Sequence, residues 1–259
     1  MPTSKDRIIF LGTAGARVVV SKQIRASGGI WLTQDDTNLF IDPGPGALVK
    51  CRTRKEKLDP RQLDGILLSH KHLDHSNDIN AMIEAMTEGG FKKKGMVFAP
   101  SDALNEDPVI LKYVREYVND IQILEENHEY IIGNIRFSPP VKHHHGDVET
   151  YGVNFFGSKY TISYITDTKF FPELSRHYRG DVLIVSVVRL KPSQYYHLCI
   201  DEARQIIEEV RPKVAILTHF GMTVVRAKPW EVAEQLSKET GLTIIAARDG
   251  MTFGLDEIC

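Results

Sequence analysis

The sequence predicts an α/β protein in which helices cover β-sheets. Its strand-like segments are short apolar runs bounded by glycine, proline, asparagine and aspartate, and amphipathic stretches with helical spacing stand between them. The last part of the chain alternates regularly and reads helix, strand, helix, strand. Alternation of this kind is typical of sheets whose faces are packed against helices.

The expected strands are the apolar runs rich in β-branched and aromatic residues. They cover residues 7–11, 28–33, 38–42, 65–69, 96–100, 130–138, 153–158, 160–166, 182–187, 214–219 and 243–247. The expected helices have apolar residues every three or four positions, and they cover residues 78–90, 108–118, 201–212 and 229–241. The third of these begins at an acidic residue and ends at a proline, which are common start and stop signals.

Composition predicts an ordinary globular protein. Of the 259 residues, 42% are apolar and 25% are charged, and the net charge is −2. Nothing therefore marks the whole surface as a binder of nucleic acid or membrane. No run of about 18 apolar residues is present, so no membrane span is expected. The length fits one domain, which we expect to span residues 1–259.

The cysteines predict a reducing compartment. Cys51, Cys199 and Cys259 are far apart and form no CxxC pair, so neither a disulfide framework nor a thiolate zinc site is expected. The first residues lack the apolar core and cleavage site of a signal peptide. We therefore expect a cytoplasmic protein.

A dense cluster of histidines and one aspartate follows the strand expected at residues 65–69. The cluster contains His70, His72, Asp74 and His75, at offsets 0, 2, 4 and 5. A helix would gather offsets 0 and 4, and a strand would align 0, 2 and 4, so bringing all four together needs a turn at a strand-to-helix junction. Imidazole and carboxylate are common ligands of transition metals. Four such groups on so short a loop favour two neighbouring metal ions over one.

Further ligand-type residues follow other expected strands. His145, Asp167 and His219 each stand just past such a strand, where sites in sheet proteins are usually assembled. They can supply the remaining ligands of a second ion. His145 ends a run of three histidines, and in an extended segment His143 would point to the same side while His144 points to the opposite one. His144 therefore stays an alternative ligand.

The segment HKHLDH, residues 70–75, has the HxHxDH pattern of the metallo-β-lactamase superfamily. The segments RIIFLGTAGAR, NLFIDPGPGAL, HHHGDVETYG, YITDT and ILTHFG resemble further elements of that superfamily, in the same order. The GTAGAR loop, the Tyr151-Gly152 pair and His197 look most like the branch of ribonuclease Z and the cyclic phosphodiesterases. The resemblance implies a four-layer αββα sandwich, in which two mixed β-sheets are flanked by helices.

The resemblance also implies a site with two divalent metal ions, which are zinc by default, with iron, manganese or nickel as alternatives. The ligands implied for the first ion are His70, His72 and His145, and those implied for the second are Asp74, His75 and His219. Asp167 would bridge the two ions.

The resemblance assigns catalytic roles around these ions, which would make hydroxide available near neutral pH. Asp74 would orient that hydroxide or take its proton. His197 would lie outside the ligand set and donate a hydrogen bond or a proton to the leaving group. Asp42 would orient a ligand or the metal-binding loop, although its position in DPGPG also suits a plain turn residue.

The leading functional hypothesis is a metal-dependent hydrolase that acts on a small-molecule or nucleotide-type phosphodiester. A tRNA substrate is not expected, because the chain has no counterpart of the long Gly/Pro-rich arm of ribonuclease Z. One alternative is an esterase, thioesterase or lactonase on the same metals, and another is an iron-dependent oxidoreductase. A non-catalytic metal-binding or RNA-binding module is the third. A homodimer is left open.

Three expectations concern the surroundings of the site. The basic runs 50–57 and 92–94 are expected to be solvated loops, which would favour an anionic substrate if they bordered the cleft. Residues 79–117 follow the metal loop and are expected to form the rim of the substrate pocket. The glycines of GTAGA would let the backbone approach closely, and their N–H groups could meet a phosphate, although the segment also suits a plain tight turn.

Overall fold

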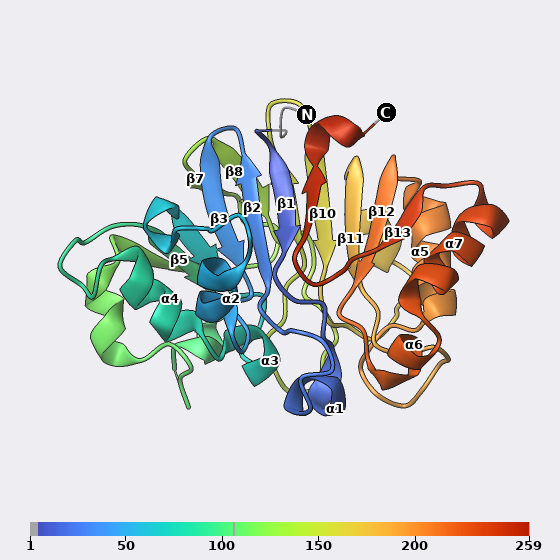
Figure 1. Ribbon diagram of the computed structural model, residues 1–259, viewed down its shortest axis with the longest axis horizontal. Coiled ribbons are helices and arrows are strands. Elements are labelled where there is room, and N and C mark those ends of the chain that lie inside the picture. Colours follow the sequence, from blue (N-terminus) through green and yellow to red (C-terminus); the bar gives the residue numbers. More distant parts are fainter. Residues whose placement is uncertain (1–4, 106, 259) are drawn as a thin grey trace.

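The computed structural model describes residues 5–105 and 107–258, so the prediction on Cys259 and the two ends of the predicted domain lie outside the described residues. Within these residues, two seven-stranded β-sheets face each other, and helices cover their outer faces (Figure 1). This arrangement confirms the predicted αββα sandwich.

The first sheet has the strand order β14-β1-β2-β3-β4-β5-β6. Neighbouring strands are antiparallel from β14 to β3 and parallel from β3 to β6. The strands of this sheet are β1 (Arg7–Phe10), β2 (Ile30–Gln34), β3 (Thr37–Ile41), β4 (Gly65–Leu67), β5 (Met96–Ala99), β6 (Asp120–Ile123) and β14 (Met251–Gly254).

The second sheet follows the same plan, with the order β13-β12-β11-β10-β9-β8-β7. It is antiparallel from β7 to β10 and parallel from β10 to β13. Its strands are β7 (Tyr130–Ile132), β8 (Ile135–Ser138), β9 (Val153–Phe156), β10 (Thr161–Ile165), β11 (Val182–Ser186), β12 (Val214–Thr218) and β13 (Ile244–Ala246).

Helices on the two outer faces close the sandwich. The helices are α1 (Ala16–Ser21), α2 (Ala47–Thr53), α3 (Leu73–Ser76), α4 (Ile79–Met86), α5 (Ile200–Val210), α6 (Met222–Arg226) and α7 (Pro229–Thr240). Helices α2 and α4 pack on the first sheet, and α5 and α7 pack on the second (Figure 1). No helix in the described part of the chain is long and apolar enough to cross a membrane.

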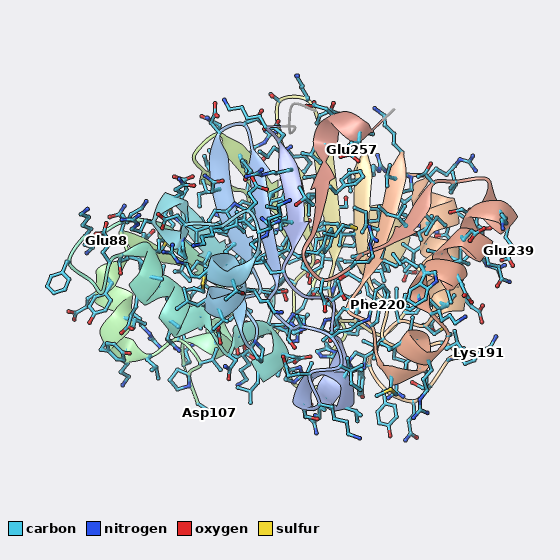
Figure 2. All side chains as sticks on the ribbon, viewed as in Figure 1. Glu88, Asp107, Lys191, Phe220, Glu239 and Glu257 are labelled. Atoms are coloured by element: carbon cyan, nitrogen blue, oxygen red, sulfur yellow. The ribbon has the colours of Figure 1, made fainter. Side chains whose placement is uncertain are left out.

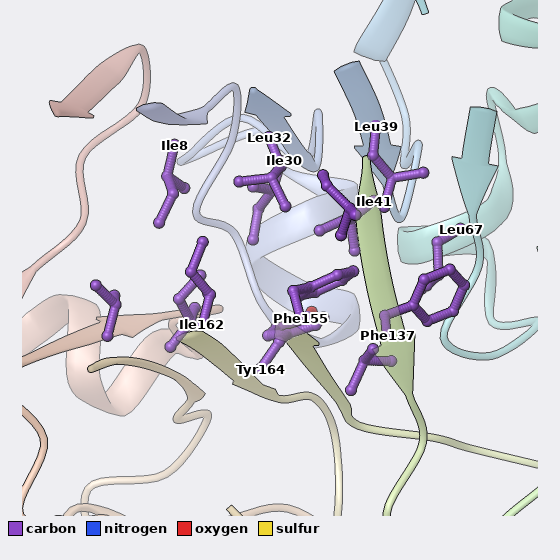
Figure 3. Packing of buried hydrophobic residues seen from close by; sticks show 14 of the residues in the cluster. Ile8, Ile30, Leu32, Leu39, Ile41, Leu67, Phe137, Phe155, Ile162 and Tyr164 are labelled. Carbon is purple, nitrogen blue, oxygen red and sulfur yellow. The ribbon is translucent and has the colours of Figure 1, made fainter. Parts of the chain in front are cut away.

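The inner strands, such as β1, β4, β11 and β12, are buried on both faces, which explains their nearly continuous apolar sequences. In β1, Ile8 points between the sheets, whereas Ile9 points toward the helices, as the two-residue period of a strand requires. Figure 3 shows the core between the sheets, where Phe155 and Ile162 of the second sheet face side chains of the first. Charged side chains such as Glu88 project from the margins of the molecule (Figure 2). Because both faces are covered, only the ends of the strands are free to carry a site.

Two of the predicted elements are wrong. Residues 108–118 form no α-helix but a loop with a 3₁₀ segment, Lys112–Tyr117. The guanidinium of Arg115 donates to the carbonyl oxygens of Leu104 and Ile110, which satisfies these groups without a regular helix. The strand predicted at residues 130–138 is a hairpin of β7 and β8, because Gly133, at φ +53°, allows a tight two-residue turn.

Candidate metal centre

The predicted ligand residues meet where β4, β10 and β12 end, close to α3, which is labelled in Figure 1. His70 follows β4, Asp167 follows β10 and His219 follows β12. His145 lies in the segment before β9. The turn predicted after β4 is present and leads into the single turn of helix α3, on which the last part of HKHLDH is wound.

The first group of side chains is His70, His72 and His145, whose ligand atoms lie within 4.8 Å of one another. His145 Nε2 is 3.0 Å from His72 Nδ1. His145 Nδ1 is 2.8 Å from the carbonyl oxygen of Tyr196, so it carries the ring proton and leaves the Nε2 lone pair facing the group. Three imidazoles with this spacing are suited to one transition-metal ion.

The second group is Asp74, His75 and His219, and its ligand atoms also lie within 4.8 Å of one another. His219 Nε2 is 3.3 Å from His75 Nε2 and 3.6 Å from Asp74 Oδ2. Asp167 lies between the two groups. Its Oδ1 is 3.4 Å from His219 Nε2, and its Oδ2 is 3.7 Å from His145 Nε2. The carboxylate of Asp167 therefore reaches both groups at once.

The buried nitrogen atoms fit divalent metal ions. His70 is fully buried, and its Nε2 has no hydrogen-bond partner among the described residues. Leaving such an atom unpaired costs about 1–3 kcal/mol, a penalty that a bound cation removes. Histidine nitrogens and carboxylate oxygens are the ligand types that zinc, iron, manganese and nickel accept.

The electrostatics keep the first group in its ligating form. Burial lowers the pKa of His70 well below its ordinary value, and the neighbouring imidazoles act in the same direction. Burial also lowers the pKa of His72 to about 4 and lowers the pKa of His145. These rings are therefore neutral at pH 7, which is the form that binds a cation.

Opposite charges dominate around Asp167 and His75. Burial would raise the pKa of Asp167, but His219 and His197 hold it well below its ordinary value. Burial would lower the pKa of His75, yet the carboxylates of Asp42 and Asp167 raise it well above its usual range. A metal ion between these residues would replace the positive charge of a protonated histidine and would stabilise the carboxylates in the same way.

Asp42 supports the second group from behind and is 4% exposed. Its Oδ1 accepts a hydrogen bond from the Ser69 backbone N–H at 2.7 Å, and its Oδ2 accepts one from the Tyr164 hydroxyl at 3.0 Å. His75 Nδ1 lies 3.0 Å from Oδ2. This contact places the proton of His75 on Nδ1 and turns Nε2 toward His219.

The three consecutive histidines point to alternating sides of an extended segment, so His143 and His145 are buried and His144 is exposed. His145 reaches the cluster, while His144 is exposed and packs its ring against Phe171 at a centroid distance of 4.5 Å. His143 is buried, and its Nε2 lies 2.6 Å from the hydroxyl of Tyr178. Of the two alternatives in the run, the structure therefore places His145 among the ligand-type side chains.

His197 lies on the open side of the cluster. Its Nε2 is 3.3 Å from Asp167 Oδ2, and its ring packs against His145 at a centroid distance of 4.9 Å. The side chain is 20% exposed, in contrast to the buried rings behind it. His197 is therefore placed to meet a molecule that enters from the solvent.

A cavity of about 860 Å³ opens over the cluster. Its walls come from α1, from residues 188–197 and from residues 221–223, so the prediction that residues 79–117 form the rim is wrong. The reason is that α1 packs against α3 and α6 and fills this position itself. The basic runs 50–57 and 92–94 are also absent from its lining.

The sequence did not indicate that two arginines line the cavity wall, because neither of them stands in a basic run. Arg17 and Arg189 line the cavity as single residues. The close backbone approach predicted for GTAGA is present, since a Cβ on Gly15 would lie 2.1 Å from the carbonyl oxygen of His219. Gly15 therefore lets this loop pack directly on the segment that carries His219.

The sequence and the fold match those of a known superfamily. Residues 37–220 match the family described as Beta-lactamase superfamily domain. An uncharacterized protein of Methanocaldococcus jannaschii is 32% identical over 257 residues, which cover 94% of this chain and 93% of that protein. The chain belongs to the β-lactamase superfamily, as the HxHxDH motif predicted. A UPF0173 metal-dependent hydrolase of Staphylothermus marinus is 26% identical over 228 residues, covering 84% of this chain and 89% of that protein.

Solved structures agree on the fold. The metallo-beta-lactamase fold protein YhfI from Bacillus subtilis superposes with a TM-score of 0.79 at 20% identity, covering 96% of this chain and 98% of that one. A diphosphatase from the PhnP family superposes with a TM-score of 0.69 at 21% identity, covering 96% of each chain. At these identities the likeness shows the fold alone.

Proposed function

We propose that this chain is a hydrolase that uses two divalent metal ions to activate water, and that its substrates are phosphodiesters. The observation that carries the proposal is the convergence of two groups of ligand atoms around the carboxylate of Asp167. The first ion would be held by His70, His72 and His145, and the second by Asp74, His75 and His219. Asp167 would contact both ions, which would be zinc by default.

The metal ions would supply Lewis acidity, which activates water near neutral pH and neutralises negative charge as it develops. Side chains of the protein would transfer the protons. Asp74 lines the cavity, and it would accept the proton of the attacking water. His197 faces the same space and would donate a hydrogen bond or a proton to the leaving oxygen.

A phosphodiester substrate is supported by the charge of the cavity wall. Arg17 and Arg189 face the space in which the substrate would lie, and guanidinium groups pair well with phosphate oxygens. The similarity to a diphosphatase of the PhnP family and to a metal-dependent hydrolase agrees with such chemistry. A second candidate is hydrolysis of an ester, thioester or lactone on the same ions, which the apolar side chains of the cavity wall favour.

Metal analysis combined with a substrate panel tests the proposal. The purified protein is assayed with bis-p-nitrophenyl phosphate, a thioester and a lactone, with metal content measured on the same sample. We expect metal-dependent cleavage of the diester, which His72→Ala abolishes by removing a ligand. His144→Ala is the matched control, because this exposed histidine lies outside the cluster, and it should keep full activity. A metal-loaded protein that cleaves the thioester or lactone but not the diester would establish the second candidate instead.

A further inference from the structure

The cavity over the metal centre has apolar walls that water activation does not need. Val18 and Val20 of α1 line one side, and Val188 and Met222 line another. Leu73 lines the same cavity, between the ligand-type residues that flank it in HKHLDH. A small, fully polar substrate would leave this carbon surface in contact with water.

The apolar side chains at the rim are unusually exposed. Val18 is 50% exposed, Leu73 is 67% exposed and Tyr195 is 51% exposed, and they come from three separate segments of the chain. Apolar surface left in water is unfavourable by about 25 cal/mol per Å². Exposed apolar side chains that gather around a cavity are typical of a binding site. Since Leu73 stands directly after His72, a ligand covering it would also reach the reacting centre.

A cation lies on the same wall. The guanidinium of Arg189 stacks over the ring of Tyr195, 4.4 Å from its centroid. The Nε of Arg189 is buried and has no hydrogen-bond partner among the described residues. The stacking holds the charge on the wall of the cavity that His197 also lines, where it can meet an anionic oxygen.

We propose that the substrate is an amphiphilic phosphodiester, which carries an alkyl chain or another apolar substituent. Its phosphate lies between the metal centre and Arg189, and its apolar substituent covers Val18, Leu73 and Met222. The inference rests on the proposed function, because it places the phosphate at the same ions. Polar substituents such as a sugar would leave the apolar wall without a complementary surface.

Chain-length dependence tests this proposal. Binding of methyl-, butyl- and octylphosphonate to the metal-loaded protein is measured by calorimetry, and hydrolysis is measured with the p-nitrophenyl methyl, butyl and octyl phosphodiesters. Each methylene group that leaves water should strengthen binding by about fourfold. The kcat/KM of the diesters should rise in the same order.

Two valine variants localise the effect. Val18→Ser should reduce the ratio of octyl- to methylphosphonate affinity by about tenfold, since it replaces two methyl groups of the wall with a hydroxyl. The matched control is Val49→Ser, which changes a valine that is 59% exposed on α2, outside the cavity, and should keep the native ratio.

The outcomes separate the two proposals. Equal affinities across the phosphonate series, or an unchanged ratio in Val18→Ser, would overturn the apolar subsite even if diesters are cleaved. Binding that strengthens with chain length, without cleavage of any diester, would support the subsite and contradict the phosphodiesterase function. A dimer that Val18→Ser dissociates, together with flat chain-length dependence, would assign the apolar surface to a second copy of the chain and also overturn the subsite.

Discussion

Replacing Asp42 with asparagine should weaken metal binding, although Asp42 would not itself contact an ion. It contacts His75 at Nδ1, the nitrogen that points away from His219. The carboxylate accepts hydrogen bonds from Ser69 and Tyr164 and contacts His75 Nδ1. In Asp42→Asn, one oxygen becomes an NH₂ donor that faces these donors. Asp42 has a φ of +54°, which asparagine tolerates well, so the backbone is preserved and the effect reports the side chain alone.

The size of the effect follows from the hydrogen bond to His75. A hydrogen bond to a charged group contributes about 1.5–3 kcal/mol, and its loss lets the ring proton move from Nδ1 to Nε2, the atom that faces His219. Every 1.4 kcal/mol corresponds to about a tenfold change in an equilibrium constant, so affinity for the second ion should fall about 10- to 100-fold. The first group should keep its ion.

Competition with a fluorescent chelator measures the two affinities separately. Asp36→Asn is the matched control, because Asp36 also has a left-handed φ, +61°, but its side chain is 64% exposed and pairs with Lys5 at the surface. Loss of that surface pair should leave stability nearly unchanged and metal affinity unchanged. Asp42→Asn protein that binds both ions with native affinity would refute the reasoning.

Three further predictions follow from the geometry. His197→Ala should lower kcat by about 10²- to 10⁴-fold with metal content unchanged, and a loss of metal would show that His197 is a ligand. Gly15→Ala should reduce metal content, because its Cβ would lie 2.1 Å from the His219 carbonyl oxygen, and native metal content would show that this loop can move aside freely. Removing the ions with a chelator should lower the midpoint of thermal unfolding, because a ligand at about 1,000 times its Kd stabilises the native state by about 4 kcal/mol. An unchanged midpoint would contradict a contribution of the ions to stability.

The strands and the place of the site could be predicted because their signals are local, whereas the αββα arrangement was implied by the resemblance to the metallo-β-lactamase superfamily. The apolar runs identified most of the strands, and the ligand-type residues stand where β4, β10 and β12 end. The two-residue period of an extended segment predicted that His143 and His145 point to one side and His144 to the other. In the structure His143 and His145 are buried and His144 is exposed. Each of these inferences depends on neighbouring residues and a fixed backbone period.

The walls of the cavity could not be predicted because they depend on how distant segments pack. Helix α1 follows a glycine-rich loop, and half of its six residues are valines, which have low helix propensity, so the sequence did not identify it. Its place beside α3 and α6 is set by tertiary contacts. The same limitation explains residues 108–118, where the apolar spacing reflects burial of Val114 and Val118 without a regular helix.

The central claim is that the side chains gathered around Asp167 bind a pair of divalent ions. Anomalous diffraction from crystals of the purified protein, collected at the absorption edge of the metal found by elemental analysis, tests it most directly. We predict two peaks, one bounded by His70, His72 and His145 and the other by Asp74, His75 and His219, with Asp167 between them. Crystals of catalytically active protein that show no anomalous peak at these side chains would contradict the account.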